Sequence, residues 1–279
     1  MKSGFLTDSL IKTGPYELNK TEKEKLFFDS LMEELKFHFE NNKQYRNFCI
    51  NKNFDPFSFE GELKEIPSIA VSVFKDLGAN LKSVPDNEVK LSLQSSATSG
   101  TPSTVVLDKI TAKRQAKVMI KVVKDFIGVE RKPFIVVDVS PEPKNIKFLG
   151  ARYAAIGGYL NFADKVNYAL VKDDNDIVSF DIEKTKLFVE ALDKNIPVIV
   201  FGFTYMLYAQ VVKPLLNKGI NFELPEGSKI IHIGGWKKLE SEKISQDEFN
   251  KSMSKLFFVK VEHVIDIYGF TEQMGLNYP

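Results

Sequence analysis

Hydroxyl groups, glycines and a carboxylate are gathered in three short segments of this sequence. The first segment, residues 95–103, is rich in Ser and Thr and could present hydroxyls and backbone N–H groups to phosphate oxygens. The second is the pair Gly234-Gly235, whose backbone could approach a flat ring closely because it has no side chains. The third runs from Tyr268 to Glu272 and ends in a carboxylate suited to Mg²⁺. Together, these residue types suit binding of a nucleotide and a metal ion.

Each segment also has an ordinary structural explanation. A stretch rich in Ser and Thr can be a surface turn, and residues 95–103 are not a P-loop because the Gly-Lys-Ser/Thr ending is absent. The glycine pair can be a plain loop that leads to a packing residue, Trp236, the only Trp of the chain. Thr271 can cap a helix while Glu272 is solvated. Taken singly, the segments therefore leave the function open.

The elements that must position these segments alternate between strands and helices. Apolar runs predict buried strands at residues 133–139, 196–202, 229–233 and 264–268, and an alternating strand at 89–94. Helical spacing predicts helices at residues 22–42, 111–127, 182–194, 205–217 and 246–256. This alternation is typical of an α/β fold with a mostly parallel sheet covered by helices. The second and third segments follow the carboxyl ends of predicted strands, which is the edge where such sheets bind ligands.

Local signals set the expected helix ends. Thr21 with Glu24, and Ser245 with Glu248, fit capping boxes, and Asp181 is the expected N-cap of the helix at 182–194. Gly128 is the expected residue after the helix at 111–127, and Pro214 is expected to bend or split the helix at 205–217.

Composition excludes several classes of protein. With 279 residues, 43% hydrophobic and 27% charged, the chain can form one large domain or two medium ones. A net charge of +1 gives no case for nucleic acid as a partner, and the absence of a long apolar run predicts no membrane span and a cytoplasmic location. Cys49 is the single cysteine and is expected to be a packed side chain. The three histidines, which are too scattered for a metal site and are expected to be structural, are His38, His232 and His263.

Taken in order, the three segments resemble the motifs of the adenylate-forming superfamily. Residues 96–103 align without a gap with that family's phosphate loop, except that Ala97 replaces a Gly and Ser103 replaces a Lys. Gly234-Gly235 matches the adenine-contacting turn, and residues 268–272 match the Tyr-Gly-any-Thr-Glu motif in full. The stretch at 234–238 followed by 246–249 is similar to the acyl-protein synthetases of bacterial luciferase operons and to their relatives in surface-polysaccharide gene clusters.

This resemblance implies the large N-terminal domain of an adenylate-forming enzyme over residues 61–279, after an arm and helix at 1–60. It implies activation of a carboxylic acid, chiefly a fatty acid, by ATP and Mg²⁺ to give acyl-AMP, with transfer to a protein thiol. Phosphate contacts would come from Ser95, Ser96, Thr98, Ser99, Gly100 and Thr101. Nucleotide contacts would also come from Gly234, Gly235, Trp236, Tyr268 and Gly269. Thr271 and Glu272 would be catalytic, and Glu272 would hold the Mg²⁺.

Family members continue beyond the Tyr-Gly-any-Thr-Glu motif with a ribose-binding Asp, a hinge, and a small C-terminal domain that carries a catalytic Lys. Those of luciferase operons also carry an acyl-accepting Cys. No counterpart precedes Pro279, so the expectation is a large domain without its closing part. The acyl group would go to an acyl-accepting reductase or carrier protein. One alternative is an incomplete fragment, or one half of a split synthetase, that binds only nucleotide or a partner such as a separate C-terminal fragment. Another is an unrelated α/β binding domain with chance matches.

Overall fold

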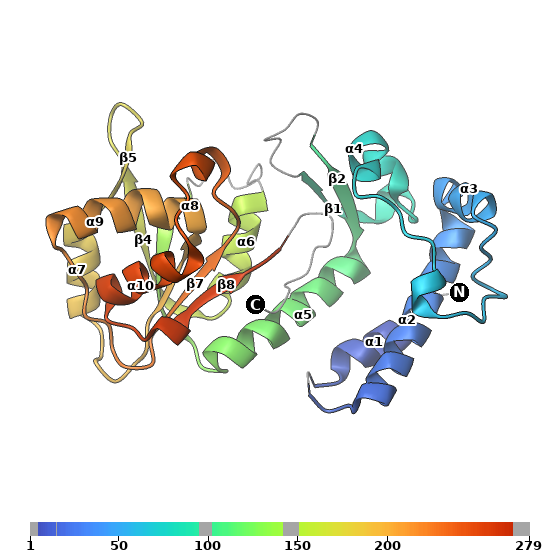
Figure 1. Cartoon of the computed structure of the whole chain (residues 1–279), viewed down its shortest axis with the longest axis horizontal. Coiled ribbons are helices and arrows are strands. Elements are labelled where there is room, and N and C mark those ends of the chain that lie inside the picture. Colours follow the sequence, from blue (N-terminus) through green and yellow to red (C-terminus); the bar gives the residue numbers. More distant parts are fainter. Residues whose placement is uncertain (1–4, 15, 95–101, 142–150, 270–279) are drawn as a thin grey trace. The chain divides into compact units, whose positions relative to one another are not determined.

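The computed structural model describes residues 5–14, 16–94, 102–141 and 151–269. These residues fall into two compact units, the first ending at Val122 and the second beginning at Val123 (Figure 1). The boundary expected at 60/61 lies inside the first unit. None of the described helices is long and apolar enough to cross a membrane.

The first unit is mainly helical. Its helices are α1 (Phe5–Lys12), α2 (Lys20–Asn41), α3 (Lys43–Asn51), α4 (Val73–Asp76) and the first part of α5 (Lys109–Ile127). Strands β1 (Val89–Gln94) and β2 (Thr104–Asp108) pair as an antiparallel two-stranded sheet. A small apolar core is formed by Met32, Tyr45, Cys49 and Phe54. Cys49 is fully buried, as expected of a packed side chain.

The cap of α2 differs from the expected one. The capping box is formed by Asn19 and Glu22, not by Thr21 and Glu24, so the helix begins at Lys20. The Asn19 side chain accepts from the backbone N–H of Glu22 at 3.0 Å, and the Glu22 carboxylate accepts from the backbone N–H of Asn19 at 3.1 Å. Asn is as good an N-cap as Thr, and its position decides which turn is the first.

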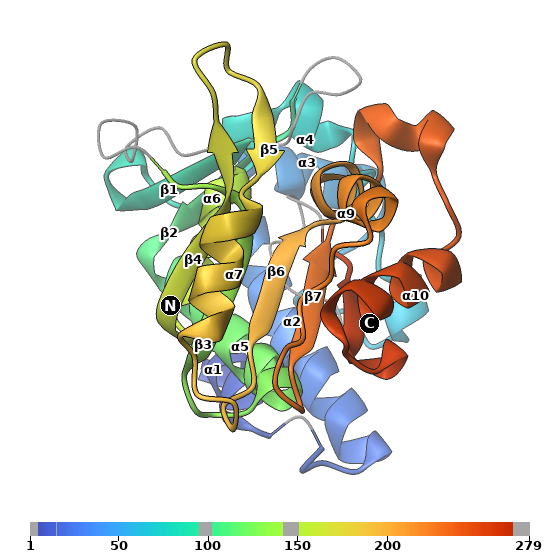
Figure 2. The ribbon, with the colours of Figure 1, turned by 90° about the vertical axis from the view of Figure 1, so that its left-hand side faces the viewer.

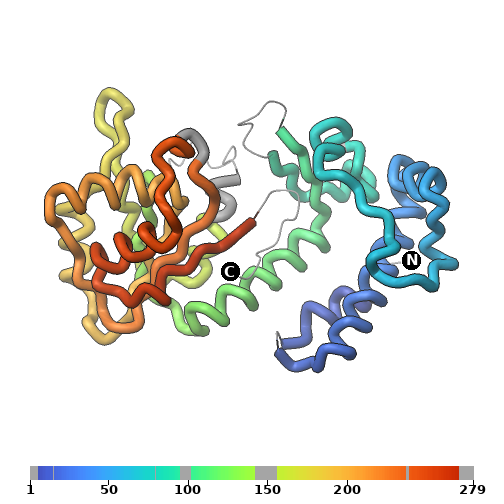
Figure 3. Tube along the Cα trace, in the orientation of Figure 1, coloured from blue at the N-terminus to red at the C-terminus, as the bar shows by residue number. Residues whose placement is uncertain are grey.

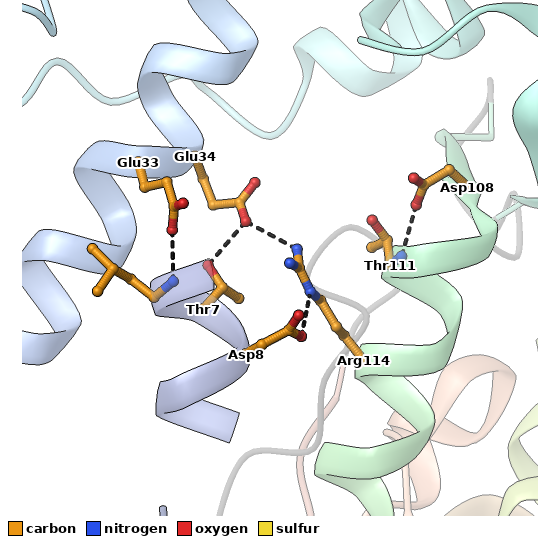
Figure 4. Close-up of polar contacts among 8 residues, drawn as sticks. Thr7, Asp8, Glu33, Glu34, Asp108, Thr111 and Arg114 are labelled. Carbon is orange, nitrogen blue, oxygen red and sulfur yellow. Dashed lines mark hydrogen bonds and ion pairs between the residues drawn. The ribbon is translucent and has the colours of Figure 1, made fainter. Parts of the chain in front are cut away.

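Arg114 of α5 joins the helices of the first unit (Figure 4). Its guanidinium donates to Asp8 of α1 at 3.1 Å and to Glu34 of α2 at 3.0 Å, with only 11% of the side chain exposed. The Glu34 carboxylate also accepts from the hydroxyl of Thr7 at 2.9 Å. The hydrogen bond from Arg114 lowers the pKa of the Asp8 carboxyl. A planar donor fork suits this shared contact better than a Lys ammonium.

The second unit is built on a six-stranded sheet with the order β5-β4-β3-β6-β7-β8, parallel except for β5. Its strands are β3 (Lys132–Val139), β4 (Ala163–Lys172), β5 (Val178–Phe180), β6 (Ile199–Phe203), β7 (Lys229–Ile233) and β8 (Val264–Ile267). Its helices include α6 (Ala151–Leu160), α7 (Ile182–Glu190), α8 (Thr204–Met206), α9 (Lys213–Lys218) and α10 (Gln246–Phe257). Figure 2 looks onto this sheet, with α7 lying over β4. The expected α/β class is confirmed.

Most predicted elements of the second unit are present. The strand at 229–233 is confirmed to the residue, and Asp181 caps α7, which ends four residues before the expected position 194. Three elements between residues 151 and 180 were not predicted. They are α6, β4 and β5. In β4 polar residues interrupt the apolar pattern, because half of this strand is exposed.

The expected helix at 205–217 is divided into three pieces, which can be followed along the trace in Figure 3. A π-helix (Leu207–Val212) lies between α8 and α9. Pro214 falls in the first turn of α9, where its missing N–H is tolerated. The backbone before it forms the wider i→i+5 hydrogen bonds of a π-helix. π-Helical segments frequently mark functional sites.

We expect Arg114→Ala to lower the free energy of unfolding by about 1–3 kcal/mol, because two acidic groups then lose their shared donor inside a partly buried contact. Lys25→Ala is a matched control, since Lys25 forms an exposed ion pair with Asp29 on α2. That change should cost no more than about 0.5 kcal/mol. Urea unfolding measures both, and equal effects of the two substitutions would contradict the role given to Arg114.

Candidate functional site

The second and third motif segments leave the sheet side by side. Gly234 follows the last residue of β7, and Tyr268 follows the last residue of β8. The two strands are parallel neighbours, and Ile233 pairs with Ile267. The prediction that both segments lie at one carboxyl edge is confirmed, while their contacts with a ligand stay a prediction.

The glycine pair forms an uncovered strip of backbone. Gly234 has φ +83°, a left-handed conformation that side chains rarely adopt, and both glycines are exposed. A Cβ added at Gly234 would lie 3.5 Å from Phe203, whereas one added at Gly235 would meet no atom within 4 Å. Tyr268 is 64% exposed beside this strip. An open backbone strip could lie against a flat heterocycle such as adenine.

Trp236 anchors the far side of the glycine turn. Its indole is 8% exposed and packs edge-on against Tyr208 of the π-helix, with ring centroids 4.8 Å apart. It also packs edge-on against Phe249 of α10, with ring centroids 6.3 Å apart. The side chain is therefore a packing residue, and any part it has in ligand binding comes from the turn that it fixes.

His232 anchors the near side of the turn, two residues before Gly234. Its Nδ1 lies 2.9 Å from the hydroxyl oxygen of Thr204 and 3.5 Å from a carboxylate oxygen of Asp266. The ring is 2% exposed, and burial lowers the pKa of His232 to about 4, so the imidazole is neutral at pH 7. Burial also raises the pKa of the Asp266 carboxyl.

This polar group was not predicted from the sequence, where His232 is expected to be structural. A weak signal was available in the spacing. His232 precedes Gly234 by two residues, and Asp266 precedes Tyr268 by two residues. Both polar residues thus lie near the ends of strands that lead directly into predicted site segments. The register pairs His232 with Asp266, which brings the two polar side chains together.

The remaining predicted site residues lie outside the described residues. These are Ser95, Ser96, Thr98, Ser99, Gly100, Thr101, Thr271 and Glu272. The first segment joins the two strands of the β1–β2 hairpin, and Ser103, at the place of the family's Lys, is fully buried. Among the residues that the structure describes, no group of three or more His, Cys, Asp or Glu could hold a metal ion. Glu272 lies outside those residues, and its metal role stays a prediction.

A cavity of about 410 Å³ lies at the opposite edge of the sheet. Its lining includes Ser228, directly before β7, and His263, directly before β8. Parallel sheets bind ligands at the carboxyl ends of their strands. We therefore place the candidate site at Gly234 and Tyr268, not in this cavity.

The fold of the chain is that of the adenylate-forming ligases. It resembles 2-hydroxyisobutyryl-CoA ligase solved in an open conformation in complex with 2-HIB-AMP and CoA, with a TM-score of 0.61 and 12% identity. That match covers 91% of this chain and 55% of the ligase. The same ligase in the thioesterification state gives a TM-score of 0.60 at 13% identity, covering 89% of this chain and 49% of the ligase. The chain thus spans about half the length of these solved structures.

The family is more specific than the fold. A family model described as acyl-protein synthetase, LuxE, matches residues 1–279, and the chain belongs to that family. It is 24% identical over 275 residues to the long-chain-fatty-acid–luciferin-component ligase of Aliivibrio fischeri, covering 97% of this chain and 69% of the relative. The ligase of the same name from Vibrio harveyi is 24% identical over 271 residues, covering 95% of this chain and 68% of that relative. The resemblance expected from the motifs is confirmed.

We expect the buried imidazole to make stability depend on pH. The unfolded chain takes up the His232 proton as the pH falls below its ordinary pKa of 6.5, but the folded chain does so only near pH 4. The wild-type protein should therefore lose stability as the pH falls through this window. Asp266, whose pKa is raised, contributes with the opposite sign in the carboxyl range.

His232→Leu removes the proton site, so its loss of stability between about pH 6.5 and pH 4 should be smaller than that of the wild type. Ser228→Ala is the control, because it disturbs a buried polar contact of the same sheet and keeps His232. Chemical unfolding at several pH values measures the slopes. If His232→Leu has the wild-type slope, the imidazole is not the group responsible.

Proposed function

We propose that this chain binds Mg²⁺-ATP and activates a long-chain fatty acid as acyl-AMP, from which the acyl group passes to a thiol of a partner protein. The observation that carries this proposal is the match of the acyl-protein synthetase family over the whole chain. The names of the two luciferin-component ligases support a long-chain fatty acid as the substrate class.

In the proposed reaction a carboxylate oxygen of the acid attacks the α-phosphorus of ATP. The bond between that phosphorus and the bridging oxygen breaks, and pyrophosphate leaves. A thiolate then attacks the acyl carbon of acyl-AMP, and AMP leaves. Such a sequence requires the protein mainly to position the reactants and to balance phosphate charge.

The exposed backbone of Gly234 and Gly235, with the ring of Tyr268, would frame the adenine. The hydroxyls and N–H groups of residues 95–101 would bind the phosphates, and Thr271 would contact the α-phosphate or the substrate carboxylate. Glu272 would hold Mg²⁺, which neutralises phosphate charge when bound.

The acyl acceptor in this proposal is a thiol of another protein, such as an acyl-accepting reductase or a carrier. Cys49, the only cysteine of this chain, is fully buried in the helical core of the first unit. Burial also raises the pKa of its thiol, which makes the reactive thiolate scarce. Cys49 is therefore a poor acceptor.

Calorimetric titration of the purified chain with ATP tests the first step, and a pyrophosphate assay with saturated fatty acids of increasing length tests the second. We expect ATP binding that strengthens with Mg²⁺, and pyrophosphate release that requires a long-chain acid and is not supported by acetate. No heat at millimolar ATP would overturn the proposal. Binding without pyrophosphate release would instead favour a chain that binds nucleotide and depends on a partner for chemistry.

A further inference from the structure

The strand end before the glycine turn carries a buried polar contact that packing alone does not explain. His232 on β7 bonds to Thr204, the first residue of α8, and lies 3.5 Å from Asp266 on β8. Among the described residues, the Nε2 atom of His232 is buried without a hydrogen-bond partner. Leaving such an atom unpaired costs stability, so an apolar residue would serve the sheet better.

Two elements, α10 and the segment 204–212, each contact the residues on both sides of the glycine turn. The ring of Phe249 on α10 packs against the His232 ring before the turn, with centroids 4.8 Å apart. It also packs against the Trp236 ring after the turn, with centroids 6.3 Å apart. The segment 204–212 likewise supplies Thr204 to His232 and Tyr208 to Trp236. Between these buried anchors, the glycine pair stays exposed.

The register links this arrangement to the third segment. His232 pairs directly with Asp266, and Gly234 and Tyr268 are the first residues after the two strands. The polar contact therefore lies one step below the pair of residues that would frame a flat ring. The backbone ladder sets the distance between the two strands, so the side-chain contact acts on how their last residues are oriented.

We propose that Thr204, His232 and Asp266 are positioning residues that hold the glycine turn and Tyr268 in the orientation that a nucleotide base needs. This inference rests on the proposed function. The three side chains would act through the backbone and would not touch the base. A preformed site loses less conformational freedom on binding, so the network would strengthen binding without adding a contact.

Because Nδ1 is the atom of His232 that bonds to Thr204, substitution of His232 by either Asn or Gln tests this idea. An Asn side chain can place an amide atom near the position of Nδ1, whereas Gln reaches toward the position of Nε2. We expect His232→Asn to keep an ATP dissociation constant close to that of the wild type. His232→Gln and Thr204→Val should each weaken ATP binding about fivefold to tenfold, as the loss of one buried hydrogen bond allows. Calorimetry with Mg²⁺-ATP measures these constants, and chemical unfolding measures stability alongside.

Ser228→Ala is the matched control. Ser228 is 1% exposed directly before β7, and its hydroxyl accepts from the backbone N–H of Val198 at 2.8 Å. This variant should lose stability and keep the wild-type affinity for ATP. A positioning role predicts that affinity follows the atom at the Nδ1 position, whereas a purely structural role predicts that affinity follows stability.

The outcomes separate the two proposals. If the wild-type chain binds no ATP, the proposed function is wrong, and the positioning role that rests on it is wrong as well. If the wild type binds ATP and His232→Gln binds it equally well, the positioning role is wrong. A loss of affinity in Ser228→Ala as large as that in His232→Gln would also overturn it. His232→Leu, which removes all polar atoms, provides a folded comparison if either amide variant is unstable.

Discussion

The candidate site depends on one constraint, which is that a glycine turn must be fixed without being covered. The backbone at Gly234 and Gly235 has to remain open to a ligand, so the usual means of holding a loop, packing over it, is not available. The chain instead buries the residues on either side. His232 and Trp236 enter the core before and after the turn, and both contact Phe249 of α10. Fixing the flanks leaves the centre of the turn exposed.

The interrupted helix after β6 contacts both flanks of this turn. The segment from Thr204 to Tyr208 must reach a histidine on one side of the turn and a tryptophan on the other. A π-helical stretch winds more widely than an α-helix and changes which side chains share a face. Lys213 at the start of α9 adds an ion pair with Glu242 beyond the turn, with a contact of 2.5 Å. The α8–α9 region thus holds the backbone that follows β7.

Much of the fold could be predicted from the sequence because its central strands are buried on both faces. The run at 229–233 is apolar apart from His232 and one terminal Lys, so its limits could be read directly. β4 was missed because its exposed residues break the apolar run, and β5 has only three residues. The cap at Asn19 was missed because two overlapping capping patterns occur within six residues, and sequence alone does not rank them.

The candidate site could be predicted only in part, for a different reason. Its glycine and tyrosine segments are continuous in sequence and could be recognised as motifs. Thr204, His232 and Asp266 are far apart along the chain, and only the strand register brings them together. A histidine in a strand gives no sign of which hydroxyl or carboxylate will face it. Contacts of this kind become visible once the register is known.

The central claim is that the open glycine turn is the surface on which a nucleotide base rests. Gly235→Ala tests it most directly, because the added methyl meets no atom within 4 Å in the protein and would project into space left for the ligand. We predict stability within about 0.5 kcal/mol of the wild type, together with an ATP dissociation constant raised about tenfold. Gly234→Ala, at φ +83°, should cost stability as well. An unchanged affinity of Gly235→Ala for Mg²⁺-ATP would contradict the account.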